Sequence, residues 1–168
     1  MAELDGKTAL ITGAGRGIGQ AIALAYARGG ARLSLGARSV SELEETADEC
    51  RKLDAEVLIT PTDVTDVSQV EGLIAATVER YSTIDILVNN AGIAGPVGVL
   101  QDNDLDAWIN TVQINLIGVY LCCRAVVPVM KRQNAGRIVN LSGAGAANAW
   151  ANMSAYCASK AAVVRLTE

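Results

Sequence analysis

The feature that most constrains this sequence is a cluster of glycines directly after a short aliphatic run. The run Thr8–Thr12 leads into Gly13-Ala14-Gly15-Arg16-Gly17-Ile18-Gly19, and a helical pattern begins within that segment. Glycines allow the backbone to turn sharply and to approach a pyrophosphate without a Cβ in the way. The helix that follows would offer free N–H groups and a partial positive charge to the phosphates. The segment therefore predicts a dinucleotide site, with an ordinary tight turn as the alternative.

Strand-like and helix-like segments alternate along the rest of the chain. Strands are expected at residues 8–12, 32–35, 56–60, 84–88 and 137–141, and helices at 17–28, 40–50, from 65 or 66, 104–133 and from about 154. This alternation predicts an α/β fold with a doubly wound parallel sheet in three layers, right-handed crossovers and the strand order 3-2-1-4-5. We expect a single domain over residues 1–168. A complete fold of this type has a sixth strand, so we also expect a truncated chain or a tail beyond it.

Two helices carry more detailed expectations. Ser41 and Glu44 have the spacing of a capping box at the start of the second helix. The buried face of that helix is expected to comprise Val40, Leu43, Ala47 and Cys50. The long helix at 104–133 is expected to turn inward Leu105, Trp108, Ile109, Val112, Leu116 and Val119. Asn115 interrupts this apolar face, and a buried amide needs hydrogen-bond partners.

Composition narrows the classes of function. The formal net charge is −4 and the basic residues are scattered, which argues against a nucleic-acid partner. The chain has no histidine, and its four cysteines lack metal-ligand spacing, so zinc and histidine-based catalysis are disfavoured. Residues 2–7 do not resemble a signal peptide, and Arg124 and Pro128 interrupt the apolar stretch 116–130. We therefore expect a cytoplasmic protein with reduced thiols and no membrane segment.

Four ordered motifs resemble those of the short-chain dehydrogenase/reductase family. They are T-G-x-x-x-G-x-G from Thr12, Asn89-Asn90-Ala91-Gly92, Asn115 in the long helix, and Tyr156-x-x-x-Lys160. The resemblance extends from Lys7 to the end of the chain, and it implies an NAD(P)-dependent oxidoreductase that interconverts a carbonyl and an alcohol. By the resemblance, the cofactor would contact Gly13, Gly15, Arg16, Ile18, Gly19, Arg38, Asp63, Val64, Asn90, Ala91, Gly92, Tyr156 and Lys160.

The end of the second strand bears on the choice of dinucleotide. An acidic residue there pairs with the ribose of NAD, whereas a nearby arginine accommodates the 2′-phosphate of NADP. The segment reads Leu35-Gly36-Ala37-Arg38, with no carboxylate, and Arg16 in the glycine turn can reach the same place. A guanidinium suits a phosphate. The sequence therefore favours NADP(H) over NAD(H), the alternative being that Arg38 is only a solvated surface charge.

Tyr156 and Lys160 are the candidates for proton transfer. They lie four residues apart in a helical pattern and so share one face. A nearby ammonium stabilises a phenolate, which makes the tyrosine a usable general acid and base. The alternative for this pattern taken alone is an amphipathic helix with a snorkelling lysine. By the resemblance, Lys160 also binds the nicotinamide ribose and Asn115 joins a proton relay, besides making a structural hydrogen bond.

The serine that would polarise the substrate oxygen departs from the common family pattern. The family usually places it thirteen residues before the tyrosine, where this chain has Gly143. Ser142 is therefore the candidate, with Ser154 and Ser159 as weaker ones. Trp150 either lines the substrate pocket or packs under the loop.

Three functions remain open at this point. The first is the NADP(H)-dependent oxidoreductase acting on a small carbonyl or alcohol. The second is a nucleotide-binding fragment without turnover. The third is an assembly subunit, since the resemblance implies homo-oligomers, dimeric or tetrameric, that pair their long helix and last helix. The apolar residues Ala155, Ala158, Val163 and Leu166 would fit such an interface or the chain's own sheet.

Overall fold

The computed structural model describes residues 3–148 and 150–168 of the chain. Its centre is a parallel sheet of five strands in the order β3-β2-β1-β4-β5, as the sequence predicts. The strands are β1 (Thr8–Thr12), β2 (Arg32–Ala37), β3 (Val57–Pro61), β4 (Ile86–Asn89) and β5 (Arg137–Asn140). Thr12 pairs with Gly36 and Asn89 pairs with Asn140. The carboxyl ends of these strands therefore lie along one edge of the sheet.

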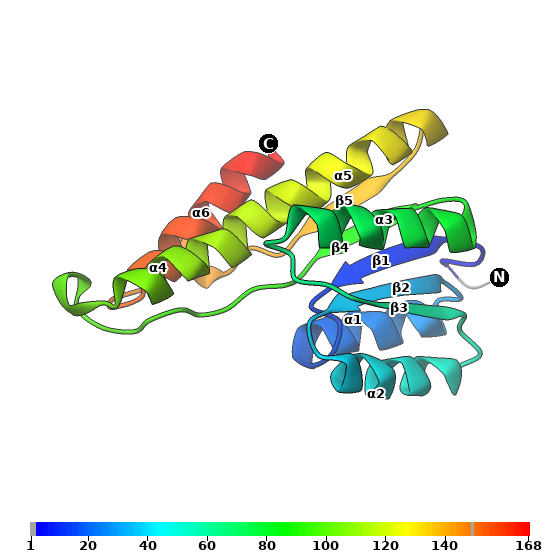
Figure 1. Cartoon of the computed structure of the whole chain (residues 1–168), viewed down its shortest axis with the longest axis horizontal. Coiled ribbons are helices and arrows are strands. Elements are labelled where there is room, and N and C mark those ends of the chain that lie inside the picture. Colours follow the sequence, from blue (N-terminus) through cyan, green and yellow to red (C-terminus); the bar gives the residue numbers. More distant parts are fainter. Residues whose placement is uncertain (1–2, 149) are drawn as a thin grey trace.

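Helices cover both faces of the sheet (Figure 1). One face carries α1 (Gly17–Arg28) and α2 (Val40–Arg51), and the other carries α3 (Val67–Tyr81) and α5 (Gly118–Gln133). A π-helical turn, η2 (Gln113–Ile117), joins α4 (Leu105–Val112) to α5, and α6 (Ser154–Thr167) packs against α4 and η2. Two short 3₁₀ turns are η1 (Leu100–Asp102) and η3 (Ala144–Ala146). The predicted three-layer α/β fold is confirmed.

Aliphatic side chains fill the two interfaces between the sheet and its helices. On the α3 and α5 side, Leu10 and Leu87 of the sheet pack with Leu73 and Val126. On the α1 and α2 side, the strand residues Ile11 and Leu35 pack against small helix residues such as Ala23 and Ala47. Burial of these side chains supplies the main stabilisation of the fold.

The start of α2 differs from the prediction. Its N-cap is Ser39, whose Oγ accepts a hydrogen bond from the backbone N–H of Glu42 at 3.3 Å. Ser39 and Glu42 have the same S-x-x-E spacing as Ser41 and Glu44, and the earlier pair is used because α2 begins at Val40. Val40 is half exposed, so its predicted burial was wrong, whereas Leu43, Ala47 and Cys50 are buried as expected.

The long helix turns inward only part of the set predicted: Val119 is buried as expected, and Trp108, Val112 and Leu116 are partly buried. Leu105 is 69% exposed and Ile109 is 44% exposed, whereas Thr111, Ile114 and Asn115 are buried. The physical reason is that α4 projects beyond the sheet (Figure 1), where its neighbour is α6 rather than strands. Pro128 lies on the exposed side of α5 and does not end the helix.

The helical segment Leu105–Gln133 is long and apolar enough to cross a membrane by length and hydropathy alone. Its buried residues, including Cys122, Val126 and Val129, belong to the core beside the sheet. This is the pattern of a core helix in a globular domain.

The strand β5 forms one edge of the sheet and is only partly covered. Ile138 packs into the core on the α5 side. Val139 points to the opposite face and is 44% exposed, and Arg137 is also exposed. On that face, β5 has no helix packed over it in the part of the chain that the structure describes.

Candidate active site

The glycine turn that follows β1 has the conformation that the sequence predicts. Gly13 has φ = +63°, in the left-handed region that favours glycine. A Cβ at this position would lie 2.8 Å from the Cα of Ala91, a contact with backbone that cannot move aside easily. The helix α1 starts at Gly17, and its N-cap residue Arg16 makes no side-chain cap. The first N–H groups of α1 are therefore not occupied by the side chain of the N-cap residue.

Hydrogen bonds join the glycine turn to the segment Asn89–Gly92 at the end of β4. The Thr12 hydroxyl accepts the backbone N–H groups of Asn90 at 3.1 Å and of Ala91 at 3.2 Å. The same hydroxyl donates to the carbonyl of Val88 at 3.4 Å. In return, the Asn90 side-chain amide donates to the carbonyls of Thr12 at 3.0 Å and of Gly13 at 2.9 Å. Two of the sequence motifs therefore hold each other in place.

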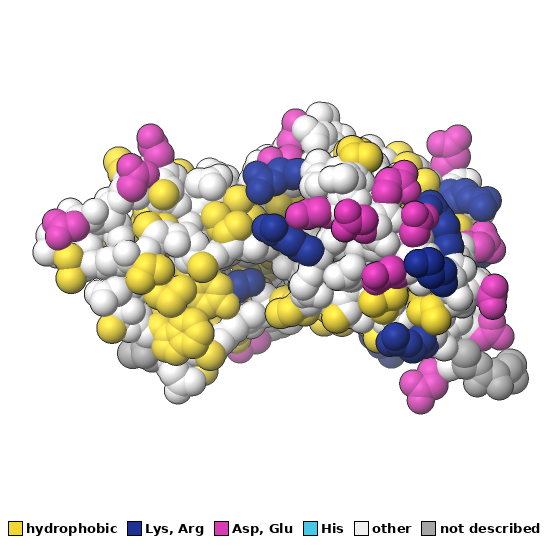
Figure 2. Space-filling view, turned by 90° about the horizontal axis from the view of Figure 1, so that it is seen from below, with side chains coloured by type: hydrophobic (Ala, Val, Ile, Leu, Met, Phe, Trp, Pro, Cys, Tyr) yellow, Lys and Arg dark blue, Asp and Glu magenta, His cyan; other side chains and the backbone are white. Residues whose placement is uncertain are grey.

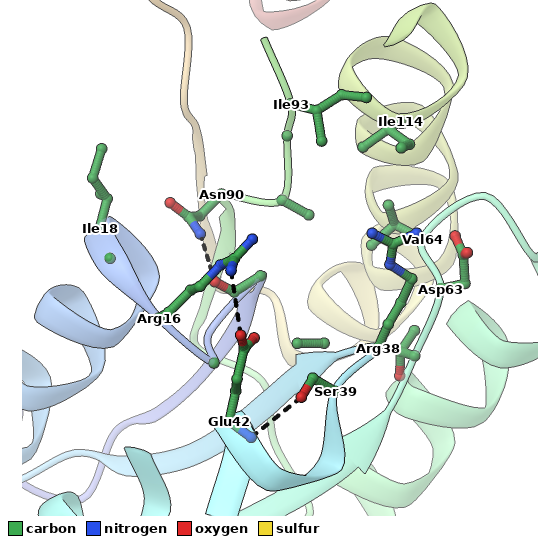
Figure 3. Close-up of a pocket in the computed structure, with 17 residues that line it drawn as sticks. Arg16, Ile18, Arg38, Ser39, Glu42, Asp63, Val64, Asn90, Ile93 and Ile114 are labelled. Carbon is green, nitrogen blue, oxygen red and sulfur yellow. Dashed lines mark hydrogen bonds and ion pairs between the residues drawn. The ribbon is translucent and has the colours of Figure 1, made fainter. Parts of the chain in front are cut away.

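A pocket of about 540 Å³ lies where β1, β2 and β4 end, and Figure 3 shows the residues around it. Ten residues predicted to contact a cofactor line it: Gly13, Gly15, Arg16, Ile18, Arg38, Asp63, Val64, Asn90, Ala91 and Gly92. Gly19 does not line the pocket, because it is packed beneath the turn against the carbonyl of Gly13. The volume is typical of a cofactor cleft. Because Gly13, Gly15 and Gly17 present backbone without side chains to the pocket, its floor fits the close approach of a dinucleotide.

Seven further residues line this pocket that were not predicted to contact a cofactor. They are Gly17, Ala37, Ser39, Glu42, Thr62, Ile93 and Ile114. The S-x-x-E spacing of Ser39 and Glu42 was the signal that could have placed the first turn of α2 beside the end of β2.

The charges in the pocket are arranged around α2 and the loop after β3. Arg16 is exposed and its Nη1 lies 3.4 Å from Oε1 of Glu42 (Figure 3). Arg38 is exposed and makes no ion pair with any residue in the described ranges. Asp63 accepts hydrogen bonds from the backbone and hydroxyl of Thr65 on one oxygen. The cationic groups therefore come from the glycine turn and from the end of β2.

Tyr156 and Lys160 lie on the same face of α6. The Lys160 Nζ is 6.0 Å from the centroid of the Tyr156 ring and donates to the carbonyl of Leu141 at 2.7 Å. Lys160 is only 5% exposed, and burial lowers the pKa of its ammonium below the ordinary value. These two side chains do not line the pocket, but Lys160 lies at its border. A Cβ on Gly92, which does line it, would be 3.5 Å from the Lys160 Nζ.

Asn115 is fully buried in the π-helical turn. Its Oδ1 accepts the N–H of Ile93 at 2.8 Å, and its Nδ2 donates to the carbonyl of Ile93 at 2.9 Å. The Nδ2 also donates to the Ser159 hydroxyl at 3.1 Å. Asn115 thereby fixes the chain just after Gly92 and ties it to α6. A π turn at such a position is frequent at functional sites.

The serine candidates are all engaged in hydrogen bonds. The Ser142 hydroxyl donates to the carbonyl of Lys160 at 3.2 Å. Ser154 accepts the indole N–H of Trp108 at 3.0 Å, and Ser159 donates to the carbonyl of Tyr156 at 2.8 Å. Ser154 and Ser159 are thus tied to helix structure, whereas Ser142 is exposed on the loop before Tyr156.

Gly143, at the position where the family usually has serine, lies against the Tyr156 hydroxyl. A Cβ on Gly143 would overlap the phenol oxygen. A serine at position 143 is therefore incompatible with this placement of Tyr156. The one-residue offset to Ser142 has a steric reason.

Apolar side chains gather beside the corner formed by Ser142, Tyr156 and Lys160. The rings of Trp150 and Tyr156 are stacked, with centroids 6.0 Å apart and planes 17° apart, and Trp150 is 47% exposed. Figure 2 shows hydrophobic side chains over the end of the molecule that carries α4 and the start of α6. Exposed large hydrophobic residues include Val97 and Val99 of the loop before η1, Leu100 of η1 and Leu105 of α4. This end offers an apolar surface next to the phenol.

Comparison with known proteins adds an independent line of support. The family model described as short chain dehydrogenase matches residues 7–168. The 2-(R)-hydroxypropyl-CoM dehydrogenase of Xanthobacter autotrophicus is 41% identical over 165 residues, which span 96% of this chain and 66% of that protein. The NADP-dependent 3-hydroxy acid dehydrogenase of Schizosaccharomyces pombe is 35% identical over 169 residues, with 99% and 65% covered.

The fold comparison agrees. A crystal structure of NAD⁺-bound xylitol dehydrogenase matches with a TM-score of 0.96 at 35% identity, covering 98% of this chain and 64% of that one. The chain therefore spans about two thirds of the length of the proteins that it resembles. The ordered motifs, the sheet topology and the family match over residues 7–168 lead to one conclusion: the chain belongs to the short-chain dehydrogenase family.

Proposed function

We propose that the protein interconverts a small alcohol and its carbonyl compound, with NADP(H) as the favoured cofactor and Tyr156 as the general acid and base. The observation that carries the proposal is the junction at Gly92. This residue lines the pocket formed by the glycine turn and lies next to Lys160 and Asn115. A cofactor bound in the pocket would thus extend toward the phenol. The names of the relatives, which are dehydrogenases of hydroxy compounds, support the reaction class.

The chain's own residues would handle the proton. A bound nicotinamide nucleotide supplies or accepts the hydride. The Tyr156 hydroxyl donates a proton to the carbonyl oxygen in reduction and accepts it from the alcohol in oxidation. The Lys160 ammonium, 6.0 Å from the phenol ring, stabilises the phenolate that results. When substrate binds, the Ser142 hydroxyl gives up its hydrogen bond to the carbonyl of Lys160 and donates one to the substrate oxygen instead. Asn115 positions Ile93 and Ser159 around this corner and belongs to the proposed proton relay.

The preference for NADP(H) is supported by the end of β2. Ala37 and Arg38 stand where an NAD-specific site has a carboxylate, and both Arg16 and Arg38 line the pocket. The matched proteins include one named NADP-dependent and one bound to NAD⁺. The cofactor preference is therefore argued from these residues and not from the relatives.

Exposed apolar side chains support a homo-oligomer. The helical segment α4–α5 exposes Leu105, Ile109, Ile117 and Tyr120, and α6 exposes Val164 and Leu166. Light scattering of the purified protein would then report a dimer or a tetramer. Cytoplasmic localisation remains a prediction from the sequence.

The test of the catalytic role is a Tyr156→Phe variant. A panel of secondary alcohols and ketones is first screened for change in reduced-nicotinamide absorbance. With an active substrate, Tyr156→Phe should lower turnover by about 10²–10⁴-fold, because the phenol is the proton donor. The control is Tyr120→Phe, which removes a hydroxyl from an exposed residue of α5. A loss smaller than about tenfold in Tyr156→Phe would exclude the phenol as the general acid. Saturable NADPH binding without turnover on any member of the panel would favour a binding function.

A further inference from the structure

Two acidic residues, Glu42 and Asp63, line a pocket that is expected to hold phosphate, and Glu42 forms an ion pair with an arginine of that pocket. Glu42 lies in the first turn of α2 and lines the same pocket as Arg16 and Arg38. Its Oε1 is 3.4 Å from Nη1 of Arg16. Figure 3 shows Glu42 joined to Arg16 by this ion pair and to Ser39 through its backbone N–H. Any anion that Arg16 binds in this pocket therefore shares that guanidinium with a carboxylate.

Two contacts fix Glu42 in this place. A Cβ at Gly15 would lie 2.8 Å from the Glu42 Cβ, so the side-chain stem packs on the glycine turn itself. One turn further along α2, the Thr46 hydroxyl donates to the carbonyl of Gly15 at 3.0 Å and is buried. The helix α2 is thus anchored to the glycine turn. The Cβ of Glu42 is therefore held beside the glycine turn. Its carboxylate can leave the pocket only by adopting a different side-chain rotamer or by a change in the backbone.

We infer that Glu42 reduces the preference for NADP(H) over NAD(H), by competing with the 2′-phosphate of NADP(H) for Arg16. The inference rests on the proposed function, because it needs a nicotinamide nucleotide in this pocket. The Arg16 side chain is 83% exposed and that of Glu42 is 36% exposed. A pair this exposed contributes little to holding Arg16 in one position. Its main effect is therefore on charge: Glu42 cancels one of the two cations that face a doubly charged phosphate.

The experiment compares nucleotide dissociation constants, measured by fluorescence titration, in the unmodified protein and in Glu42→Gln. Glutamine keeps the length and packing of the side chain and removes only its charge. NADPH should bind about fivefold or more tightly in the variant, because Arg16 then no longer shares its charge with the Glu42 carboxylate. NADH lacks the 2′-phosphate, and its dissociation constant should change by less than about twofold. The gain for NADPH should shrink as salt is raised.

The matched control is Glu45→Gln. Glu45 lies on the same helix, is exposed and does not line the pocket, so this variant changes the net charge by the same amount elsewhere. It should alter neither dissociation constant by more than about twofold. Circular dichroism and thermal unfolding of both variants would show that α2 is intact.

Four outcomes are decisive. Weaker NADPH binding in Glu42→Gln would mean that the carboxylate positions Arg16, and would overturn the inference. An equal gain for both nucleotides would also overturn it, because the effect would then not depend on the 2′-phosphate. If the unmodified protein binds neither nucleotide saturably, the proposed function itself fails. If it binds both and Glu42→Gln changes nothing, only the inference about Glu42 fails.

Discussion

The two ends of the site are built in different ways. At the cofactor end, the ends of β1 and β4 are joined by the buried Thr12 hydroxyl and the Asn90 amide, and the pocket floor is backbone. At the corner formed by Ser142, Tyr156 and Lys160, the hydrogen bonds are made by the side chains that are proposed to act on the substrate. Lys160 binds the carbonyl of Leu141, and Ser142 binds the carbonyl of Lys160.

The two ends differ in how much must rearrange when ligands bind. At the cofactor end, the backbone has its final shape once the chain has folded, because hydrogen bonds within the protein hold Gly13 and its neighbours in place. Side chains in the corner must exchange their present partners for the substrate. We therefore expect substitutions at the first end to alter binding and stability together. Those in the corner should alter turnover with little effect on stability.

The largest effect should come from Gly13→Ala. Alanine at φ = +63° is strained by about 1–2 kcal/mol, and its Cβ would also lie 2.8 Å from the Cα of Ala91. We expect NADPH affinity to fall by more than about 100-fold, because the turn must move from the phosphate site. Calorimetric titration measures this. The control is Gly72→Ala in the exposed interior of α3, where a Cβ meets nothing within 4 Å. Unaltered affinity in Gly13→Ala would remove the distinction between the two ends.

Ser142→Ala tests the corner formed by Ser142, Tyr156 and Lys160. If Ser142 holds the substrate oxygen, turnover should fall by about 100-fold. The free energy of unfolding should change by less than about 1 kcal/mol, because the hydroxyl is exposed and makes one hydrogen bond to a backbone carbonyl. Steady-state kinetics and urea unfolding give the two numbers. Unchanged turnover would leave Ser142 only a structural contact of α6.

Thr12→Val, unlike Ser142→Ala, should act mainly on stability. Valine has nearly the same shape, but it leaves the N–H of Ala91 without its acceptor, and the N–H of Asn90 keeps only the carbonyl of Val88 at 3.2 Å. We expect a loss of about 1–3 kcal/mol in the free energy of unfolding, because one N–H group is left unpaired. Urea unfolding checks this, with Thr12→Ser expected to retain most of the stability. A second control is Thr60→Val, since the Thr60 hydroxyl has no hydrogen-bond partner in the described part of the chain. Equal stabilities for Thr12→Val and Thr60→Val would contradict the role of the Thr12 hydroxyl.

The smallest effect concerns the pH dependence of stability. Burial lowers the pKa of Lys160 in the folded protein, so the unfolded chain binds more protons between the folded and the unfolded pKa. Stability from this group is therefore reduced at neutral pH and recovers as pH rises toward the unfolded value. The free energy of unfolding of the unmodified protein, relative to that of Lys160→Met, should therefore rise as pH is raised from 7 to about 10. Lys131→Met, at an exposed lysine of α5, should show no such trend in urea unfolding. A constant difference in stability for Lys160→Met would contradict the burial argument.

Much of the fold could be predicted, because its signals are local. The aliphatic runs, the glycine turn and the segment Asn89–Gly92 each specify their own backbone shape, and their order along the chain determines the sheet. Ten of the eleven residues predicted to contact only the cofactor line the pocket. The missing one, Gly19, supports the turn from beneath.

What could not be predicted depends on tertiary position. Ser39 and Ser41 offer the same capping pattern, and only the length of β2 decides between them. Leu105 and Ile109 have a helical apolar period, but α4 extends past the sheet that would have covered them. The hydrogen bond of Ser142 to Lys160 depends on how the loop meets α6. Residue type indicates the chemistry in such places, and packing decides the orientation.

The free edge of β5 has a consequence for the behaviour of the protein in solution. Backbone groups on the outer side of Arg137–Asn140 have no partner strand in the described ranges, and the exposed Val139 lies beside them. Such an edge is a template onto which a strand from another chain can add. Wherever this edge is uncovered, aggregation should therefore increase with protein concentration. A charged residue in place of Val139 should suppress it.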